Sequence, residues 1–212
     1  MKNTVIFSIV FLCGTVLGSC FGGGSGANAS AAATAETENK TEASAAAVEQ
    51  EPVETGIIAT ALPIVYQLAD GTTKVLPHLD LSIKKYVIGI WSGGMCVALR
   101  QFHGDWDGAM NKNGSKSRQY GSEWELPARG TDTGKLREEI EKFNNTVVTL
   151  KEDKIDADPW DTSMQGGYYW TKTTSGTNGA YYFGMQGIYG AGGTREKDGA
   201  AKVRYVRKDV KR

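Results

Sequence analysis

The stretch Gly-Tyr-Tyr-Trp-Thr-Lys-Thr-Thr-Ser-Gly-Thr-Asn-Gly-Ala-Tyr-Tyr-Phe-Gly-Met, residues 167–185, decides the fold class of this chain. Aromatic residues gather near both of its ends, and the turn-forming run Ser-Gly-Thr-Asn-Gly at 175–179 lies between them. Short aromatic and β-branched runs bounded by Gly, Asn and Ser are typical of β-strands. We therefore predict strands over 168–171 and 180–185, and a third over 201–207 after another Gly-rich turn.

Upstream, the same reasoning predicts two more pairs of strands. The runs 63–68 and 72–76 flank Asp70-Gly71, a dipeptide that favours a tight hairpin turn. The apolar runs 86–91 and 95–99 are separated by turn residues and are predicted to pair in the core.

One helix is predicted over residues 133–144. Leu136, Ile140 and Phe143 recur at i, i+4 and i+7 and form one apolar stripe. The sequence also allows a second, shorter helix within 107–120, although the Gly residues in this segment disfavour helix formation. Together these elements predict an α+β fold of small, mainly antiparallel sheets with one or two helices and long Gly-rich loops.

The first 19 residues have the pattern of a removable signal. Lys2 precedes an apolar run of about fifteen residues, shorter than the ~20 that span a membrane. The next residues resemble a bacterial lipobox, in which cleavage precedes a cysteine that receives diacylglycerol. The candidate lipobox is Leu17, Gly18 and Ser19, followed by the lipidation site Cys20. Ordinary secretion after Ser19 is the alternative.

Residues 20–55 are predicted to form a disordered tether rich in Gly, Ala and Glu, because they contain too few bulky apolar side chains to build a core. A flexible chain of this length has a root-mean-square span of ~30–35 Å. Residues 56–212 are predicted to form one globular domain. We expect the protein in the cell envelope, lipid-anchored at the outer membrane or the cell surface.

Charge and cysteine content exclude several classes of protein. The chain has 24 Lys and Arg against 24 Asp and Glu, so we expect no nucleic-acid partner. Once Cys20 is acylated and the signal is removed, Cys96 is the only thiol, which excludes a disulfide framework within the domain. The apolar neighbours of Cys96 favour a small buried hydrophobe over a reactive thiol.

Four motifs occur in a recognisable order. They are Trp124-Glu125-Leu126-Pro127, then 167–173, then Ala180-Tyr181-Tyr182-Phe183, then Val203-Arg204-Tyr205-Val206-Arg207. This order resembles the C-terminal domain family of collagen-like bacterial adhesins over roughly residues 85–209. The resemblance implies a C-type-lectin-like fold related to formylglycine-generating enzymes, and characterised adhesins with this domain bind polyanionic glycans. Two segments depart from the family pattern, Thr171-Lys172-Thr173 and Pro127-Ala128-Arg129-Gly130.

Nothing in the sequence indicates an enzyme or a cofactor. A formylglycine-generating activity needs cysteines late in the domain, and none follows Cys96. The two histidines, His78 and His103, are interpreted as surface or loop residues. Acidic residues at 153–161 leave open a calcium-binding loop, with a solvated acidic loop as the alternative. No metal site is assigned.

The sequence therefore predicts a non-enzymatic binding or adhesion module for polyanionic glycans, or for another surface or matrix protein. The alternative is a structural or assembly component of the envelope. Strand alternation lets only half of the aromatic set around 160–189 share one face, so the loop aromatics are the preferred contacts. The candidate ligand-binding residues are Trp160, Tyr189, Lys202, Arg204 and Arg207. For the basic residues, the alternative is a charged edge strand exposed to solvent.

Overall fold

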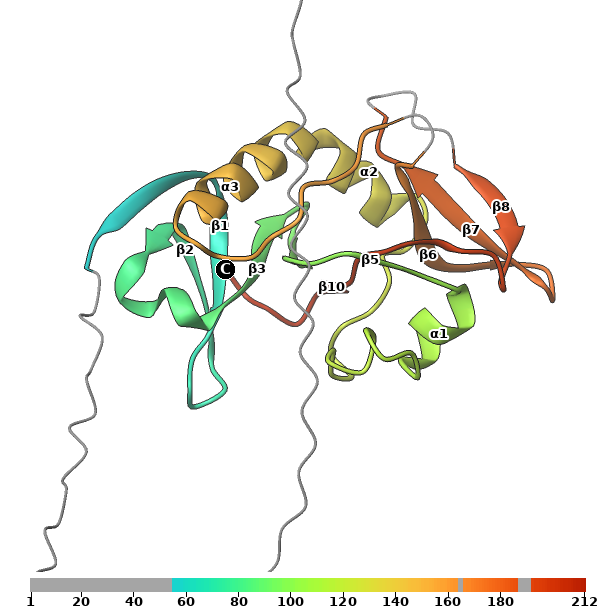
Figure 1. Ribbon diagram of the computed structural model, residues 1–212, viewed down its shortest axis with the longest axis horizontal. Coiled ribbons are helices and arrows are strands. Elements are labelled where there is room, and N and C mark those ends of the chain that lie inside the picture. The colour runs from blue at the N-terminus through green and yellow to red at the C-terminus, as the bar shows by residue number, and fades with distance from the viewer. Residues whose placement is uncertain (1–54, 164–165, 187–191) are drawn as a thin grey trace, which may run out of the picture. The chain divides into compact units, whose positions relative to one another are not determined.

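The computed structural model describes residues 55–163, 166–186 and 192–212 (Figure 1). The predicted signal, the lipobox with Cys20, the tether up to residue 54 and the candidate Tyr189 lie outside these ranges. Within them, no helix combines the length and the apolar character needed to cross a membrane.

The predicted N-terminal hairpin and the predicted core pair both belong to one sheet. This first sheet contains five strands in the order β10-β4-β3-β1-β2, and all neighbours are antiparallel. Its strands are β1 Ile57–Gln67, β2 Thr73–Asp80, β3 Val87–Ser92, β4 Met95–Ala98 and β10 Val206–Arg207. The strand pairs predicted from the Asp-Gly turn and from the Ser-Gly-Gly turn are confirmed.

The aromatic stretch at 167–185 forms the centre of a second sheet. This sheet has the order β5-β9-β6-β7-β8 and is antiparallel except where β6 meets β9. Its strands are β5 Phe102–Gly104, β6 Tyr168–Ser175, β7 Gly179–Gly184, β8 Gly193–Glu196 and β9 Ala201–Val203. The described residues therefore form a mixed α+β protein with two sheets and few helices.

Helices connect and cover the sheets. They are α1 Trp106–Asn111, α2 Thr131–Glu138, α3 Ile140–Glu152 and a 3-10 helix, η1, at Leu81–Tyr86. Figure 1 shows α3 lying along the first sheet, and α1 near the second sheet. The prediction of a single helix over 133–144 is wrong in two respects. The helix is interrupted at Glu139, and the part after the interruption extends to Glu152.

The helix breaks at Glu139 for a reason that involves a distant turn. The side chain of Glu139 accepts hydrogen bonds from Ser92 Oγ (2.9 Å) and the Gly93 backbone N–H (2.7 Å), and its backbone is not helical (φ −112°, ψ 11°). The helix that follows continues to Glu152 because its apolar stripe continues. Val147 and Leu150 follow Phe143 at i+4 and i+7, and all three are buried.

Two hydrophobic clusters form the core, and both sheets contribute to each. The first contains Ile64 and Ile90 from the first sheet together with Tyr169 and Phe183 from the second. The second cluster includes Val65, Ala98, Trp106, Trp124, Leu126, Trp170, Val203 and Tyr205. Because the sheets share both clusters, residues 57–210 contain one continuous folded core rather than two separable ones.

The last predicted strand crosses from one sheet to the other. Residues 201–207 form two strands rather than one, because Arg204 and Tyr205 fall between β9 and β10. β10 pairs with β4 and, at Val206, with Glu125, and the two backbone hydrogen bonds between Glu125 and Val206 are both 2.8 Å. The Trp-Glu-Leu-Pro motif and the C-terminal motif therefore lie side by side.

Cys96 lies at a tight contact between β3 and β4. A Cβ atom added to Gly89 would lie 2.5 Å from both Cys96 Sγ and the Val97 carbonyl oxygen, so only glycine fits there. Cys96 is fully buried, and this burial raises the pKa of its thiol. The prediction of a small buried hydrophobe is confirmed.

Candidate functional site

Trp160 is a core residue, so the expectation of an exposed loop aromatic is wrong. Its side chain is 2% exposed and packs against Phe143, Tyr169 and Phe183, with ring centroids 5.6, 4.6 and 6.2 Å away. The side chain of Asn144 forms two hydrogen bonds with the backbone of Trp160. It accepts from Trp160 N at 2.7 Å and donates to Trp160 O at 3.2 Å. The loop therefore turns this indole inward, away from any soluble ligand.

Arg204 is also buried, which contradicts its assignment to a ligand-binding strand. It is 1% exposed, and its guanidinium carbon lies 4.4 Å from the centroid of the Trp160 ring. Its Nη2 donates to Gln101 Oε1 (2.9 Å) and to the carbonyl oxygens of Asp158 (2.8 Å) and Pro159 (3.1 Å). Burial lowers the pKa of Arg204 to about 10, which leaves it protonated at neutral pH.

The other two basic candidates are paired with carboxylates. Arg207 is 8% exposed and forms a bidentate ion pair with Asp209, at 2.6 and 2.8 Å. Lys202 Nζ pairs with the carboxylate of Asp161. The alternative of a charged edge strand is wrong for β9, which lies between β5 and β6. The basic C-terminal segment therefore does not present a free row of cations.

Three of the four aspartates in the acidic segment 153–161 pair with cations of the protein itself. Arg100 pairs with Asp156 and, through Nε, with Asp158 Oδ2 at 3.1 Å. Asp161 pairs with Lys202. Among the described residues, no group of three or more His, Cys, Asp or Glu side chains is arranged to hold a metal ion.

A chain of hydrogen bonds joins this acidic segment to the buried arginine. The Tyr169 hydroxyl accepts from the Asp161 backbone N–H (2.8 Å) and donates to Gln101 Oε1 (2.6 Å). The same oxygen of Gln101 accepts from Arg204. Burial raises the pKa of Tyr169 to about 12, so the hydroxyl keeps its proton at neutral pH. These groups bond to one another and so stabilise the fold rather than form a reactive site.

Acid is expected to remove the contribution of Asp161 to stability. Burial alone would raise the pKa of Asp161, but hydrogen bonds from Lys202 and Ser163 and the charge of Lys202 lower it to about 2, from an ordinary 3.8. The stabilisation is therefore complete above about pH 4 and is lost as the pH falls through about 2. Thermal unfolding across this range should show a gap between wild type and Asp161→Asn that closes on acidification. A gap that stays constant with pH would contradict this assignment.

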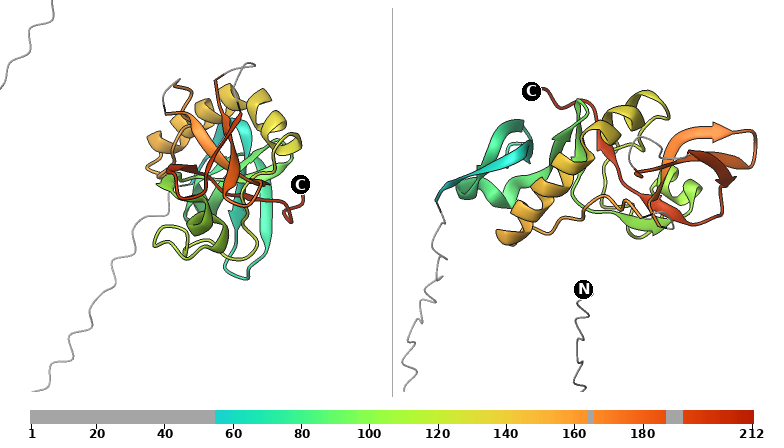
Figure 2. Two further views of the ribbon diagram at one scale, coloured as in Figure 1. Left: turned by 90° about the vertical axis from the view of Figure 1, so that its right-hand side faces the viewer. Right: turned by 90° about the horizontal axis from the view of Figure 1, so that it is seen from above.

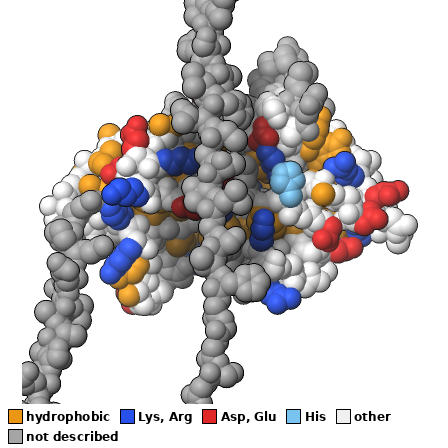
Figure 3. All heavy atoms as spheres, viewed as in Figure 1, with side chains coloured by type: hydrophobic (Ala, Val, Ile, Leu, Met, Phe, Trp, Pro, Cys, Tyr) orange, Lys and Arg blue, Asp and Glu red, His pale blue; other side chains and the backbone are white. Residues whose placement is uncertain are grey.

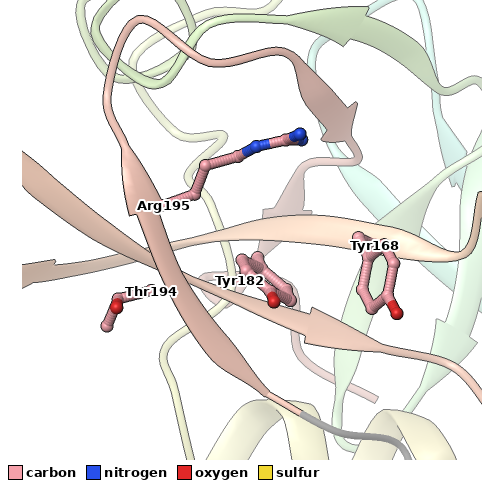
Figure 4. Close-up of a pocket in the computed structure, with 4 residues that line it drawn as sticks. All are labelled: Tyr168, Tyr182, Thr194 and Arg195. Carbon is pink, nitrogen blue, oxygen red and sulfur yellow. The ribbon is translucent and has the colours of Figure 1, made fainter.

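An open pocket lies on the second sheet, on strands β6, β7 and β8. It is lined by Tyr168, Tyr182, Thr194 and Arg195 and has a volume of about 260 Å³ (Figure 4). All four side chains are partly or fully exposed. In the close-up the two tyrosine rings lie on neighbouring strands, and Arg195 extends from the edge strand β8 (Figure 4).

The sheet register places the two rings together. Tyr182 is paired with Gly193, and a Cβ atom at Gly193 would lie 2.5 Å from the Tyr182 hydroxyl oxygen. The glycine therefore lets the Tyr182 ring lie across β8. Tyr168 meets this ring edge to face, with centroids 4.9 Å apart and an interplanar angle of 72°.

Arg195 brings a positive charge to this aromatic pocket. Its Nη1 donates to the Ala200 carbonyl oxygen at 2.5 Å, and no ion pair with it occurs among the residues that the structure describes. Hydrophobic and Lys or Arg side chains lie next to each other over this part of the second sheet (Figure 3). The pocket can therefore offer aromatic surface, a hydroxyl group and guanidinium N–H donors to one ligand.

A second Arg–Tyr pair lies on the other side of the same strand. The guanidinium carbon of Arg129 lies 3.8 Å from the centroid of the Tyr181 ring. Tyr181 and Tyr182 are consecutive in β7, so their side chains point to opposite faces of the sheet. Arg129 thus resembles Arg195 in charge and aromatic neighbour but does not line the pocket.

The candidate residues chosen from the sequence include no residue of this pocket. Tyr168 and Tyr182 belong to the aromatic set around 160–189, from which the loop aromatics were preferred, and Thr194 and Arg195 were not considered. No motif surrounds these two residues. The signal that would have found them is the pairing of β8 with β7, which depends on the register of two strands separated by a loop.

No known family model matches the chain, and the curated proteins contain no match to it. The resemblance to the adhesin C-terminal domains therefore rests on the four motifs.

Proposed function

We propose that the chain is a surface lipoprotein, anchored through Cys20, whose domain at 56–212 is a non-enzymatic binding module for polyanionic glycans. On this proposal the fold is C-type-lectin-like, and the ligand binds in the pocket of Tyr168, Tyr182, Thr194 and Arg195. The observation that carries the proposal is the half-buried Tyr168–Tyr182 pair beside the exposed Arg195, a cation without an ion-pair partner in the described part of the chain.

The pocket has the two kinds of group that such a ligand needs. Aromatic rings offer flat apolar surface to the C–H faces of a sugar ring. A guanidinium donates paired N–H groups to a sulfate or carboxylate, and hydrogen bonds to charged groups are stronger than neutral ones.

Arg195 also differs from the basic candidates chosen from the sequence, because within the described residues it is not paired with one of the protein's own carboxylates. Lys202 and Arg207 are already paired, and Arg204 is buried. Arg195 bonds only to a backbone carbonyl oxygen in the described structure. An incoming anion therefore does not have to displace an internal ion pair at Arg195.

Binding should be tested with residues 21–212, which contain both core clusters, on immobilised sulfated and neutral oligosaccharides. Arg195→Gln is expected to weaken binding to the sulfated glycan by about tenfold or more, as the loss of a hydrogen bond to a charged group predicts. Binding by the wild type should weaken with added salt, because the attraction is partly electrostatic. EDTA should have no effect.

Arg129→Gln is the matched control, because it removes the same charge next to a tyrosine on the other face. It should leave most of the affinity intact. Equal losses in the two variants would indicate non-specific attraction to total charge and would contradict the pocket. Absence of binding to every glycan would favour a structural or assembly component of the envelope.

A further inference from the structure

Two glycines border the candidate pocket, and the first of them lies under the Tyr182 ring. Gly193 is in β8 and is the direct partner of Tyr182 in β7. A Cβ atom at Gly193 would lie 2.5 Å from the hydroxyl oxygen of Tyr182 and 2.7 Å from the ring carbon that carries it. Non-bonded carbon atoms pack at about 3.5–4.0 Å. The Tyr182 ring therefore occupies the space that a side chain at position 193 would fill.

The second glycine has the same relation to Arg195. Gly199 lies in the turn after β8, where its backbone N–H donates to the Glu196 carbonyl oxygen at 3.0 Å. A Cβ atom at Gly199 would lie 3.0 Å from Cδ and 3.1 Å from Cγ of Arg195. The guanidinium end is held by the hydrogen bond from its Nη1 to the Ala200 carbonyl oxygen at 2.5 Å. The turn therefore fixes both the aliphatic part and the charged end of this side chain.

The backbone does not require glycine at either position. Neither Gly193 nor Gly199 is among the described glycines with a positive φ angle. Alanine could therefore adopt both backbone conformations, and only the contacts with Tyr182 and Arg195 oppose it. An aromatic side chain that lies across a glycine of an edge strand is a known device of β-sheets.

The Tyr182 ring is oriented by packing alone. Its side chain packs against the second core cluster and meets Tyr168 edge to face, and its hydroxyl forms no hydrogen bond within the described residues. β7 and β8 lie at one extreme of the described structure, in both Figure 1 and the right-hand view of Figure 2. The contact with Gly193 therefore has a large share in setting where this ring lies.

We propose that Gly193 and Gly199 are positioning residues of the pocket, Gly193 for the Tyr182 ring and Gly199 for the Arg195 guanidinium. The inference rests on the proposed function and deepens it. Side chains that already have their bound arrangement lose less conformational freedom when a ligand binds, so a preorganised pocket gains affinity. The fixed separation of ring and guanidinium also selects the distance between the sugar face and the anionic group of the ligand.

The arrangement can be tested without a ligand, by nuclear magnetic resonance on residues 21–212. Nuclear Overhauser contacts are expected between the Gly193 Hα protons and the Tyr182 ring, and between the Gly199 Hα protons and the Arg195 side chain. In Gly193→Ala the contacts between the Tyr168 and Tyr182 rings should be lost or weakened. A wild-type protein without the two glycine contacts would overturn the proposal.

Binding to dextran sulfate, with neutral dextran as the reference, measures the effect on the pocket. We expect Gly193→Ala to lower the affinity by about tenfold and Gly199→Ala by about threefold, because a binding site held about 1 Å out of place loses much of its function. The smaller effect at 199 follows from its longer contacts with Arg195. Gly134→Ala is the matched control, since a Cβ atom there would meet nothing within 4 Å, and it should keep the wild-type affinity.

Double variants separate positioning from a general effect on the fold. If each glycine acts through one side chain, Gly193→Ala should cost little further affinity in a Tyr182→Ala protein, and Gly199→Ala little in an Arg195→Gln protein. Thermal unfolding should follow the same pattern, with a smaller loss from Gly193→Ala once Tyr182 is alanine. This comparison also decides the case of a Gly193→Ala protein that folds poorly.

The possible outcomes distinguish this inference from the proposed function. Additive losses in the double variants, or an unchanged affinity in Gly193→Ala, would overturn the positioning role while leaving the pocket as the binding site. A wild-type protein that binds neither dextran sulfate nor any other glycan would contradict the proposed function itself.

Discussion

Replacing Trp160 with alanine is expected to destabilise the domain by about 3–5 kcal/mol, the usual cost of removing a buried aromatic side chain. The indole lies between Phe143, Tyr169 and Phe183, so its removal leaves a cavity that three rigid rings cannot easily fill. It also removes the surface on which Arg204 stacks. Urea unfolding followed by circular dichroism measures the loss as a lower midpoint.

Two further substitutions separate cavity formation from other effects. Trp160→Phe keeps an aromatic ring and removes an indole N–H that is buried and has no hydrogen-bond partner among the described residues, so its cost should be much smaller. Trp91→Ala removes a half-buried tryptophan and should also cost less than Trp160→Ala. A Trp160→Ala protein with wild-type stability and lost glycan binding would restore the interpretation of Trp160 as an exposed contact.

The second large effect is expected for Arg204→Met, which should cost about 3 kcal/mol or more because several buried acceptors lose a charged donor at once. Gln101 Oε1 and the carbonyl oxygens of Asp158 and Pro159 all accept from its Nη2. Methionine retains apolar volume but supplies no hydrogen bond. The same urea titration measures the loss, with the exposed Lys211→Met as the control.

Arg204→Lys tests the geometry of the guanidinium rather than its charge. Lysine keeps the positive charge but lacks the planar group that stacks on Trp160, so we expect a loss nearly as large as that of Arg204→Met. Because Trp160 and Arg204 touch, the double variant should lose less than the sum of the two single variants. A stable Arg204→Met protein with reduced glycan binding would contradict the structural role.

Strong local patterns predicted most strands correctly. The Asp70-Gly71 hairpin, the β3–β4 pair and the strands at β6 and β7 all occur where turn residues separate apolar or aromatic runs. Such patterns work because turn chemistry and strand alternation act over a few residues. The helix break at Glu139 was missed because its side chain is hydrogen-bonded to Ser92 and Gly93, which lie 47 and 46 residues away in sequence.

The candidate ligand-binding residues were chosen by residue type. This choice was wrong for Trp160 and Arg204, because both side chains are buried. An arginine or tryptophan looks like a contact residue in any loop or charged run, yet Trp160 and Arg204 stack on each other in the core. A residue's environment depends on what the rest of the chain packs against it. Arg195 was missed for the converse reason, since nothing in its own neighbourhood sets it apart before β8 is paired with β7.

The sequence by itself determined the α+β class, the turns and the apolar faces, because periodicity and turn preference are local properties of the chain. It also supplies the lipobox-like signal and tether, which stay predictions. Tertiary structure alone decided that residues 201–207 divide between two sheets, that the acidic segment pairs with Arg100 and Lys202, and that Tyr168, Tyr182 and Arg195 share a pocket. Each of these depends on contacts between segments far apart in sequence, whose free energy no local pattern contains.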